Sequence, residues 1–104
     1  MFSFEVEQKE SAIHVMIGGE LTIYSADSVF NQHVKVLPSD SDLSIDLSGV
    51  EEIDTAGMQI LLMLRQACEK RSKKLEFSSL SEPVSRYLEL FNLTEVFSLA
   101  TQAD

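Results

Sequence analysis

Basic residues are scarce in this sequence. Eight Lys and Arg residues stand against 17 Asp and Glu residues, which leaves a formal net charge of -9 at pH 7. Nucleic-acid binding depends on cations that neutralise phosphates, so this balance argues against a DNA or RNA partner and favours a protein partner. The longest uninterrupted apolar stretch, residues 60–64, is far shorter than the roughly 18 residues of a membrane span. We therefore expect no segment that inserts into a membrane.

Cysteine is nearly absent as well. Cys68 is the only one, which excludes an internal disulfide and a thiolate metal cluster within one chain. The first residues, Met-Phe-Ser-Phe-Glu, contain no basic segment followed by an apolar one, so we expect no secretory signal and a cytoplasmic location. The length of 104 residues is enough for one hydrophobic core, and a single domain over residues 1–104 is expected.

Residue groupings typical of catalysis are also missing. His14 and His33 lack the spaced companions of a metal site or a catalytic triad. Glu51, Glu52 and Asp54 cluster, yet a hard-cation site needs about six oxygen ligands and no loop is spaced to supply them. A Gly-rich phosphate loop ending in Lys and Ser or Thr is absent. We predict a protein that is not an enzyme and that has no metal and no cofactor.

Hydrophobic periodicity predicts alternating strands and helices. Apolar residues that alternate with polar ones predict strands at 4–6, 13–17, 43–47 and 75–77. Apolar residues at three- and four-residue steps predict helices at 25–37, 55–70 and 81–91, the last ended by Asn92, with a final helical turn at 93–97. Residues 18–22 are expected to form a turn and residues 48–54 a loop. Strands separated by helices pair in parallel through right-handed crossovers, so the expected fold class is α/β, a four-stranded mixed β-sheet packed with α-helices.

The helix expected at 55–70 carries two sets of apolar residues. One set should lie on the sheet: Gly57, Ile60, Leu61, Leu64 and Cys68. Met58 and Leu62, four residues apart, point to a different side and leave apolar surface partly uncovered. Such a pair suits a protein partner or a homodimer, and equally a core position beneath the third helix.

Cations follow the same helix. Lys70, Arg71, Lys73 and Lys74 lie at its carboxyl end, where positive charge complements the negative end of the helix dipole. An anion site is the alternative interpretation of this basic cluster.

Asp54-Thr55-Ala56-Gly57 resembles the Asp-Ser/Thr-Ser/Thr-Gly switch motif of STAS domains. These small modules occur in anti-sigma factor antagonists, in sulfate transporter tails and in some lipid-transport accessory proteins. Three further segments resemble the family: Gly-Glu-Leu-Thr at 19–22, Asp-Leu-Ser-Gly-Val at 46–50 and Leu-Phe-Asn-Leu-Thr-Glu-Val-Phe at 90–97. The resemblance spans nearly the whole chain and implies a STAS-like fold, that of the anti-sigma factor antagonists.

The resemblance also implies a switch and places its phosphate acceptor at the second hydroxyl position, which is Ala56 in this sequence. Alanine cannot accept a phosphate, so the switch is expected to be locked in its unphosphorylated form unless a kinase uses Thr55. A helix N-terminus can hold a phosphate, and Asp54 and Thr55 can equally act there as a simple helix cap. Gly57 in the first turn indicates the close approach of a backbone, either from residues 18–20 of this chain or from a partner.

A protein-binding function follows from the resemblance. The partner surface it implies consists of Tyr24, Ser25, Thr55, Met58 and Leu62. The module would act in signalling and transcription regulation as an anti-sigma factor antagonist, which frees a sigma factor by capturing the anti-sigma kinase that holds it. Two alternatives share the fold: an accessory subunit that docks on the ATPase of an ABC-type lipid transporter, and an adaptor in a chemotaxis or stress pathway.

Overall fold

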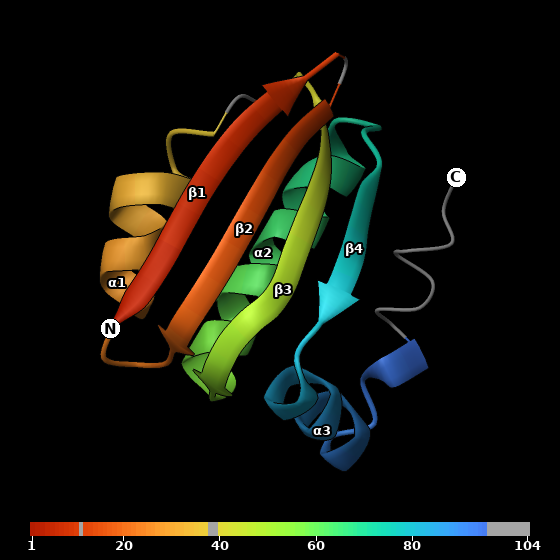
Figure 1. Cartoon of the computed structure of the whole chain (residues 1–104). Coiled ribbons are helices and arrows are strands. Elements are labelled where there is room, and N and C mark those ends of the chain that lie inside the picture. The colour runs from red at the N-terminus through yellow and green to blue at the C-terminus, as the bar shows by residue number, and fades with distance from the viewer. Residues whose placement is uncertain (11, 38–39, 96–104) are drawn as a thin grey trace.

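Four strands form one mixed sheet in the computed structural model, which describes residues 1–10, 12–37 and 40–95. Their order across the sheet is β1 (Phe2–Lys9), β2 (Ala12–Leu21), β3 (Asp42–Ile53) and β4 (Leu75–Leu80). β1 and β2 form an antiparallel hairpin, while β2, β3 and β4 run parallel to one another (Figure 1). The predicted mixed four-stranded sheet is confirmed.

Helices connect the parallel strands. They are α1 (Ala26–Val29), the π-helix η1 (Phe30–Val34), α2 (Thr55–Lys70) and α3 (Glu82–Leu90). α1 and α2 lie on the same face of the sheet, and α3 lies beyond the end of β4 (Figure 1). No helix in the described ranges is long and apolar enough to cross a membrane.

Apolar side chains on the helix-facing side of the sheet line up in rows across the strands. Ile13 pairs with Leu43, and Leu43 pairs with Leu75. All three side chains are buried, as the alternation of apolar and polar residues predicts. The second row repeats the arrangement with Val15, Ile45 and Phe77.

α2 covers these rows with the apolar face predicted for it. Gly57, Ile60, Leu61, Leu64 and Cys68 are all buried. The helix begins and ends at the predicted residues, Thr55 and Lys70. Its carboxyl end is closed by a Schellman motif: Ser72, at φ 56°, donates to Glu69 O, and Lys73 N donates to Cys68 O at 2.9 Å.

α3 ends in the same way. Asn92 adopts φ 57° and Leu93 N donates to Leu88 O at 2.7 Å, so the prediction of Asn92 as the terminator is confirmed. Phe91, expected on the buried face, is half exposed because the helix stops at Leu90. The helical turn predicted at 93–97 extends beyond the described residues.

β2 and β3 are longer than predicted. Residues 18–21 continue β2 and residues 48–53 continue β3, so the predicted turn and loop are wrong. The two strands keep pairing here, with Gly19 opposite Val50 and Leu21 opposite Ile53, through two register shifts. Bulges of this kind break the alternation that sequence patterns depend on, which explains why both strands were predicted too short.

The first predicted helix is in place but is not a uniform α-helix. Four α-helical residues are followed by the five π-helical residues of η1. Lys35 N donates to Phe30 O at 2.9 Å, five residues back, and this bond defines the wider turn. His33, on the same segment, stacks on Phe4 at a centroid distance of 4.7 Å and thereby attaches the helix to β1.

Candidate functional site

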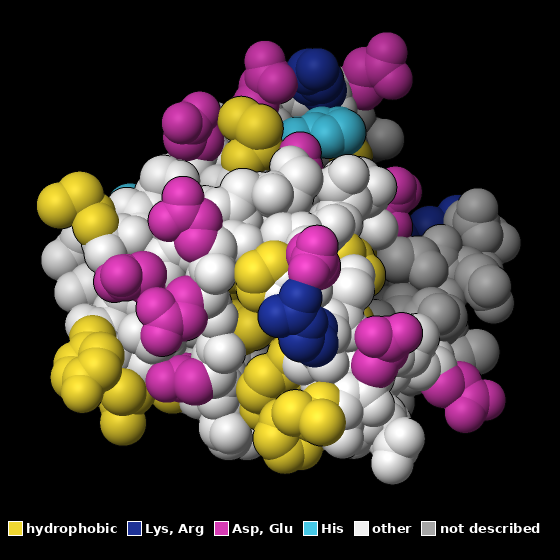
Figure 2. Space-filling model, turned by 60° about the horizontal axis from the view of Figure 1, so that its bottom comes forward, with side chains coloured by type: hydrophobic (Ala, Val, Ile, Leu, Met, Phe, Trp, Pro, Cys, Tyr) yellow, Lys and Arg dark blue, Asp and Glu magenta, His cyan; other side chains and the backbone are white. Residues whose placement is uncertain are grey.

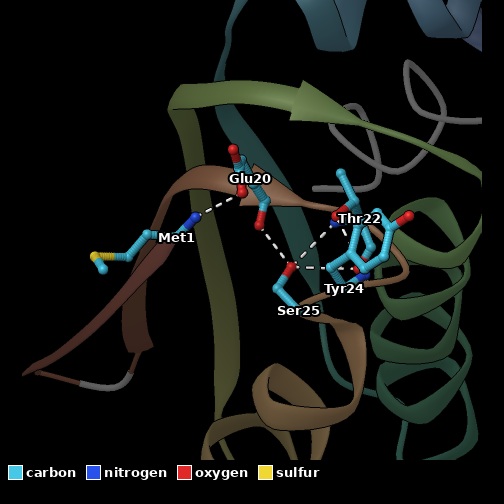
Figure 3. A network of polar contacts seen from close by, with 5 residues as sticks. All are labelled: Met1, Glu20, Thr22, Tyr24 and Ser25. Atoms are coloured by element: carbon cyan, nitrogen blue, oxygen red, sulfur yellow. Dashed lines mark hydrogen bonds and ion pairs between the residues drawn. The ribbon is translucent and has the colours of Figure 1, made fainter.

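The segment between β2 and α1 is a tight turn held by the hydroxyl of Ser25 (Figure 3). Ser25 Oγ donates to Glu20 O at 2.6 Å and accepts from Thr22 N at 3.1 Å. Ser25 and Thr22 are buried, so the turn has a fixed shape. Its two outermost residues, Ile23 and Tyr24, face solvent with exposed fractions of 67% and 94%.

The start of β1 supports this turn from the other side. The amino group of Met1 lies 2.6 Å from the carboxylate of Glu20, and Glu20 N donates to Met1 O at 2.8 Å (Figure 3). Gly19 has φ 77°, and a Cβ at this position would overlap Met1 O. Only glycine leaves room for the chain to pass so closely here.

Asp54 connects the turn to the N-terminus of α2. Its Oδ1 accepts from Gly57 N at 3.0 Å, which makes Asp54 the N-cap of the helix. Its Oδ2 accepts from Ile23 N at 2.9 Å. A single carboxylate therefore fixes the position of Ile23 and Tyr24 relative to the first turn of α2.

Gly57 lets the helix approach β2. A Cβ at Gly57 would overlap the carbonyl oxygen of Leu21, so no other residue fits without movement of the backbone. The backbone that approaches Gly57 is thus the protein's own. It belongs to Leu21, one residue after the predicted segment 18–20. This contact and the Asp54 bonds place the end of β2 and the start of α2 side by side.

α3 joins the same end of the molecule through Tyr87. The hydroxyl groups of Thr55 and Tyr87 lie 3.0 Å apart and form a hydrogen bond. Tyr87 in turn packs against Phe91, with the two rings tilted by 32° and their centroids 4.5 Å apart. Together these contacts define what we call the strand-end surface: Ile23, Tyr24, Thr55, Tyr87 and Phe91.

Two of the five predicted partner residues lie on this surface. Tyr24 and Thr55 are exposed, whereas Ser25 is buried and shapes the turn from within. Leu62 is half buried and packs against the core. The expectation that Met58 is uncovered is wrong, because its side chain is only 3% exposed and belongs to the core.

The physical reason lies in the neighbouring glycine. Because Gly57 allows the first turn of α2 to press against Leu21, Met58 is drawn into the core beside it. Val84 and Leu88 of α3 are buried in the same cluster. The alternative of a core position for Met58 is therefore the correct one.

The sequence interpretation missed the exposure of Ile23 and Phe91 and the hydrogen bond between Tyr87 and Thr55. The sequence did hold a signal for Ile23. It is an apolar residue in a short connection between two elements, and such connections lie on the protein surface, so its side chain could have been predicted to be exposed. Tyr87 and Phe91 were assigned to a core-facing helix stripe, since their spacing of four residues is that of a buried face. Tyr87 is partly buried and packs against the core, as that spacing predicts. Phe91 is exposed because α3 ends at Leu90, a boundary that periodicity does not report.

The strand-end surface is surrounded by negative charge. Figure 2 shows this end of the molecule, with acidic side chains lying between groups of hydrophobic ones and basic side chains sparse among them. The exposed carboxylates of Glu20, Glu51 and Glu52 are carried by the ends of β2 and β3. Farther along β3, the hydroxyl and N–H groups of Ser48 lower the pKa of Asp46 by hydrogen bonding to its carboxylate.

Metal-binding geometry is not found in the described part of the chain. No group of three or more His, Cys, Asp or Glu side chains there could hold a metal ion. His33 stacks on Phe4 with ring centroids 4.7 Å apart and meets Phe2 edge to face at 5.7 Å. His14 is half buried on β2, where it pairs with Glu7 of β1 and Ser44 of β3.

Solved structures share this arrangement of sheet and helices. The crystal structure of an anti-sigma factor antagonist from Mycobacterium paratuberculosis matches with a TM-score of 0.78 at 23% identity, covering 99% of this chain and 93% of that one. A sulfate transporter family protein from Wolinella succinogenes matches with a TM-score of 0.69 at 23% identity, covering 86% of this chain and 73% of that one. At these identities the likeness establishes the fold, which is that of anti-sigma factor antagonists.

The sequence places the chain within one family. Residues 4–100 match the family model described as "Mlab, STAS domain". A relative from Bacillus subtilis (strain 168), the anti-sigma-B factor antagonist, is 26% identical over 100 residues, covering 96% of this chain and 92% of the relative. The chain belongs to the STAS domain family and resembles its anti-sigma factor antagonists.

Proposed function

We propose that this protein is a regulatory module, not an enzyme, that binds a protein partner through the strand-end surface in the manner of an anti-sigma factor antagonist. The observation that carries the proposal is the position of Ile23 and Tyr24. Both side chains face solvent, yet their backbone is fixed by Asp54 and by the buried hydroxyl of Ser25. Exposed apolar and aromatic groups on a rigid backbone lose little entropy on binding and suit the centre of an interface.

The composition of the surface supports the same function. Tyr24, Tyr87 and Phe91 are aromatic, and aromatic residues are enriched in the cores of protein interfaces. Carboxylates on β2 and β3 lie around them, so the partner surface we expect is apolar at its centre and basic at its rim. Such a partner would be guided by long-range attraction to the net charge of -9.

The proposed mechanism is occupancy of the partner without chemistry. In an antagonist of this kind, the module captures an anti-sigma factor with kinase-like character and so releases the sigma factor. The family resemblance aligns Ala56 with the usual phosphate acceptor, and on that alignment we propose that binding is constitutive and is not switched off by phosphorylation there. Thr55 keeps a hydroxyl, but it is engaged with Tyr87.

Ala56 also favours a second candidate function. A module without an acceptor at this position fits a permanent accessory subunit as well as it fits a signalling switch. The same strand-end surface would then dock on the ATPase subunit of an ABC-type lipid transporter. The identity of the captured protein separates the two candidates.

Affinity capture from the native cell with three variants tests the proposal. Ile23→Asp and Tyr24→Asp place a charge at the centre of the surface and should abolish capture, since a charge desolvated in an interface is costly. Val36→Asp is the matched control, because Val36 is 71% exposed but lies after η1, away from this surface. Equal capture by all four proteins would refute the strand-end surface. An anti-sigma kinase in the captured material would support the function of an anti-sigma factor antagonist. A transporter ATPase would instead support the function of an accessory transporter subunit.

A further inference from the structure

A cavity of about 300 Å³ lies between η1, the start of β3 and the carboxyl-terminal half of α2. It is at the opposite end of α2 from Thr55 and shares no residue with the strand-end surface. Its walls are mostly apolar, with Phe30 and Val34 of η1 facing Met63, Leu64 and Ala67 of α2. This size is at the lower end of the range for small-molecule sites, which runs from roughly 300 to 1,000 Å³.

Cations gather at this cavity in a protein that is otherwise acidic. Lys35, Arg71 and Lys73 line it, which is three of the eight basic residues in the chain. Among the residues that the structure describes, no carboxylate lies within ion-pair distance of any of the three. The nearby Asp42 accepts a hydrogen bond from Lys74 N at 2.9 Å. Arg71 donates to Ala67 O at 3.5 Å, and burial together with the charge of nearby Asp42 raises the pKa of the Cys68 thiol on the same cavity. The three cations thus have polar neighbours but no ion pair among the described residues.

The helix dipole explains only part of this clustering. Arg71 and Lys73 follow the carboxyl end of α2, where cations are expected. Lys35 is the C-cap residue of η1, so it too lies at the carboxyl end of a helix. The dipoles account for a cation at each helix end but not for the convergence of both ends on one cavity, and an anion site would account for that convergence.

The π-helical turn positions Lys35. In an α-helix, a residue five positions ahead lies about 140° around the axis, given 3.6 residues per turn. In η1 the hydrogen bond from Lys35 N to Phe30 O closes the wider turn and brings the two residues onto the same side. Lys35 thus joins Phe30 and Val34 in lining the cavity. π-helical turns occur frequently at functional sites, which agrees with a ligand here.

We propose that this cavity binds a medium-chain fatty acid, with the acyl chain between η1 and α2 and the carboxylate near Lys35, Arg71 and Lys73. The apolar walls suit a hydrocarbon chain, and the guanidinium of Arg71 can bind a carboxylate through two parallel hydrogen bonds. The cavity lies at the lower end of the size range for small-molecule sites, which suits an acyl chain of medium length better than a long one.

Calorimetric titration of the whole protein with decanoate tests the proposal. We expect saturable binding of one decanoate per chain. Decylamine has the same chain and the opposite charge, so it should not bind, and 1-decanol should bind at least about tenfold more weakly. Cys68 lines the cavity, and bound decanoate should slow its reaction with iodoacetamide.

Variants locate the site. Arg71→Gln and Lys73→Gln should each raise the dissociation constant of decanoate about tenfold, as expected for the loss of one charged hydrogen bond. Lys9→Gln removes the same charge from β1, and because Lys9 does not line the cavity the exchange should leave binding unchanged. Ala67→Trp should fill the cavity and abolish binding. If that variant does not fold, the two exchanges to glutamine still decide the matter, because neither residue belongs to the core.

Three results would overturn the proposal. They are the absence of saturable binding, equal binding of decylamine and decanoate, and unchanged affinity in both Arg71→Gln and Lys73→Gln. Each is independent of the strand-end surface, so the failure of one proposal leaves the other standing.

Discussion

Asp54 accepts a hydrogen bond from Ile23 N at 2.9 Å, although the two residues are 31 positions apart in the sequence. The same carboxylate caps α2 through Gly57 N. One side chain therefore determines both where the helix begins and where the turn after β2 lies. In the motif Asp-Thr-Ala-Gly, the first residue is the structural centre of the site whether or not a phosphate is ever attached.

Replacing Asp54 tests this dual function. Asp54→Ala removes the N-cap and leaves two N–H groups without their acceptor, so we expect the free energy of unfolding to fall by about 1–3 kcal/mol. Asp54→Asn keeps a capping oxygen and should cost less. Urea unfolding monitored by circular dichroism gives these values. Glu52→Ala, an exposed carboxylate removed from β3, should stay within about 0.5 kcal/mol and serves as the control.

Replacing Gly57 with alanine should change the stability of the protein in the direction opposite to that of an ordinary helical glycine. A helical Gly→Ala exchange normally stabilises by about 1 kcal/mol. Gly57→Ala should instead destabilise by about 3 kcal/mol or more, because the new methyl group overlaps Leu21 O. Gly49→Ala is the matched control, since a Cβ there meets Gly18 Cα at an ordinary 3.4 Å. Thermal unfolding of both variants measures the contrast, and a stabilised Gly57→Ala would contradict the close approach of β2 and α2.

Two methionines of α2 provide a comparison between core and surface. Met58→Ala should lower the free energy of unfolding by about 2–5 kcal/mol, since Met58 is buried in the core. Met63→Ala, on the same helix but 40% exposed, should cost about 1 kcal/mol or less. Chemical denaturation of the two variants measures the difference. Similar losses would mean that the first turn of α2 packs differently from the structure described above.

Negative charge at the switch motif should turn partner binding off. Thr55→Glu and Ala56→Glu each add a carboxylate beside Asp54, where it must be desolvated as the partner docks, so we expect affinity to fall more than about tenfold. Thr55→Ala should have little effect on affinity. Gln66→Glu makes an equal charge change on the far half of α2 and should bind normally.

Mass spectrometry of the native protein completes this test. We expect no phosphate on residues 54–57, because Ala56 has no hydroxyl and the hydroxyl of Thr55 is bonded to Tyr87. Stoichiometric phosphate on Thr55 would instead restore a kinase-controlled switch displaced by one residue. Unchanged affinity in both glutamate variants would place the interface away from the N-terminus of α2.

Regular periodicity predicted the parts of the fold that depend on local pattern. The alternation through Ile13 and Val15 and the helical spacing of Leu61 and Leu64 each identified a buried face correctly. The extension of β3 through Val50 was missed because it depends on the partner strand β2, which supplies the pairing. Local pattern carries no information about such partners.

Some residues of the site were likewise predictable from the sequence, and others depend on tertiary contacts. Tyr24 and Thr55 were identified through the family resemblance, and both are exposed. Met58 was misplaced because its burial follows from the contact between Gly57 and Leu21, a tertiary approach. The π-helical turn in η1 is equally invisible in the sequence, since its apolar residues keep the spacing of an ordinary helix. These features had to be observed in three dimensions.

The position of β1 at the margin of the sheet affects how copies of this protein behave at high concentration. A free strand margin presents unpaired backbone groups that can template aggregation. If a second copy paired antiparallel with β1 about Val6, Glu5 of each copy would stand opposite Glu7 of the other. Like charges directly opposite one another destabilise a strand pair. In that register the two glutamates therefore oppose the addition of a second copy to the margin of the sheet.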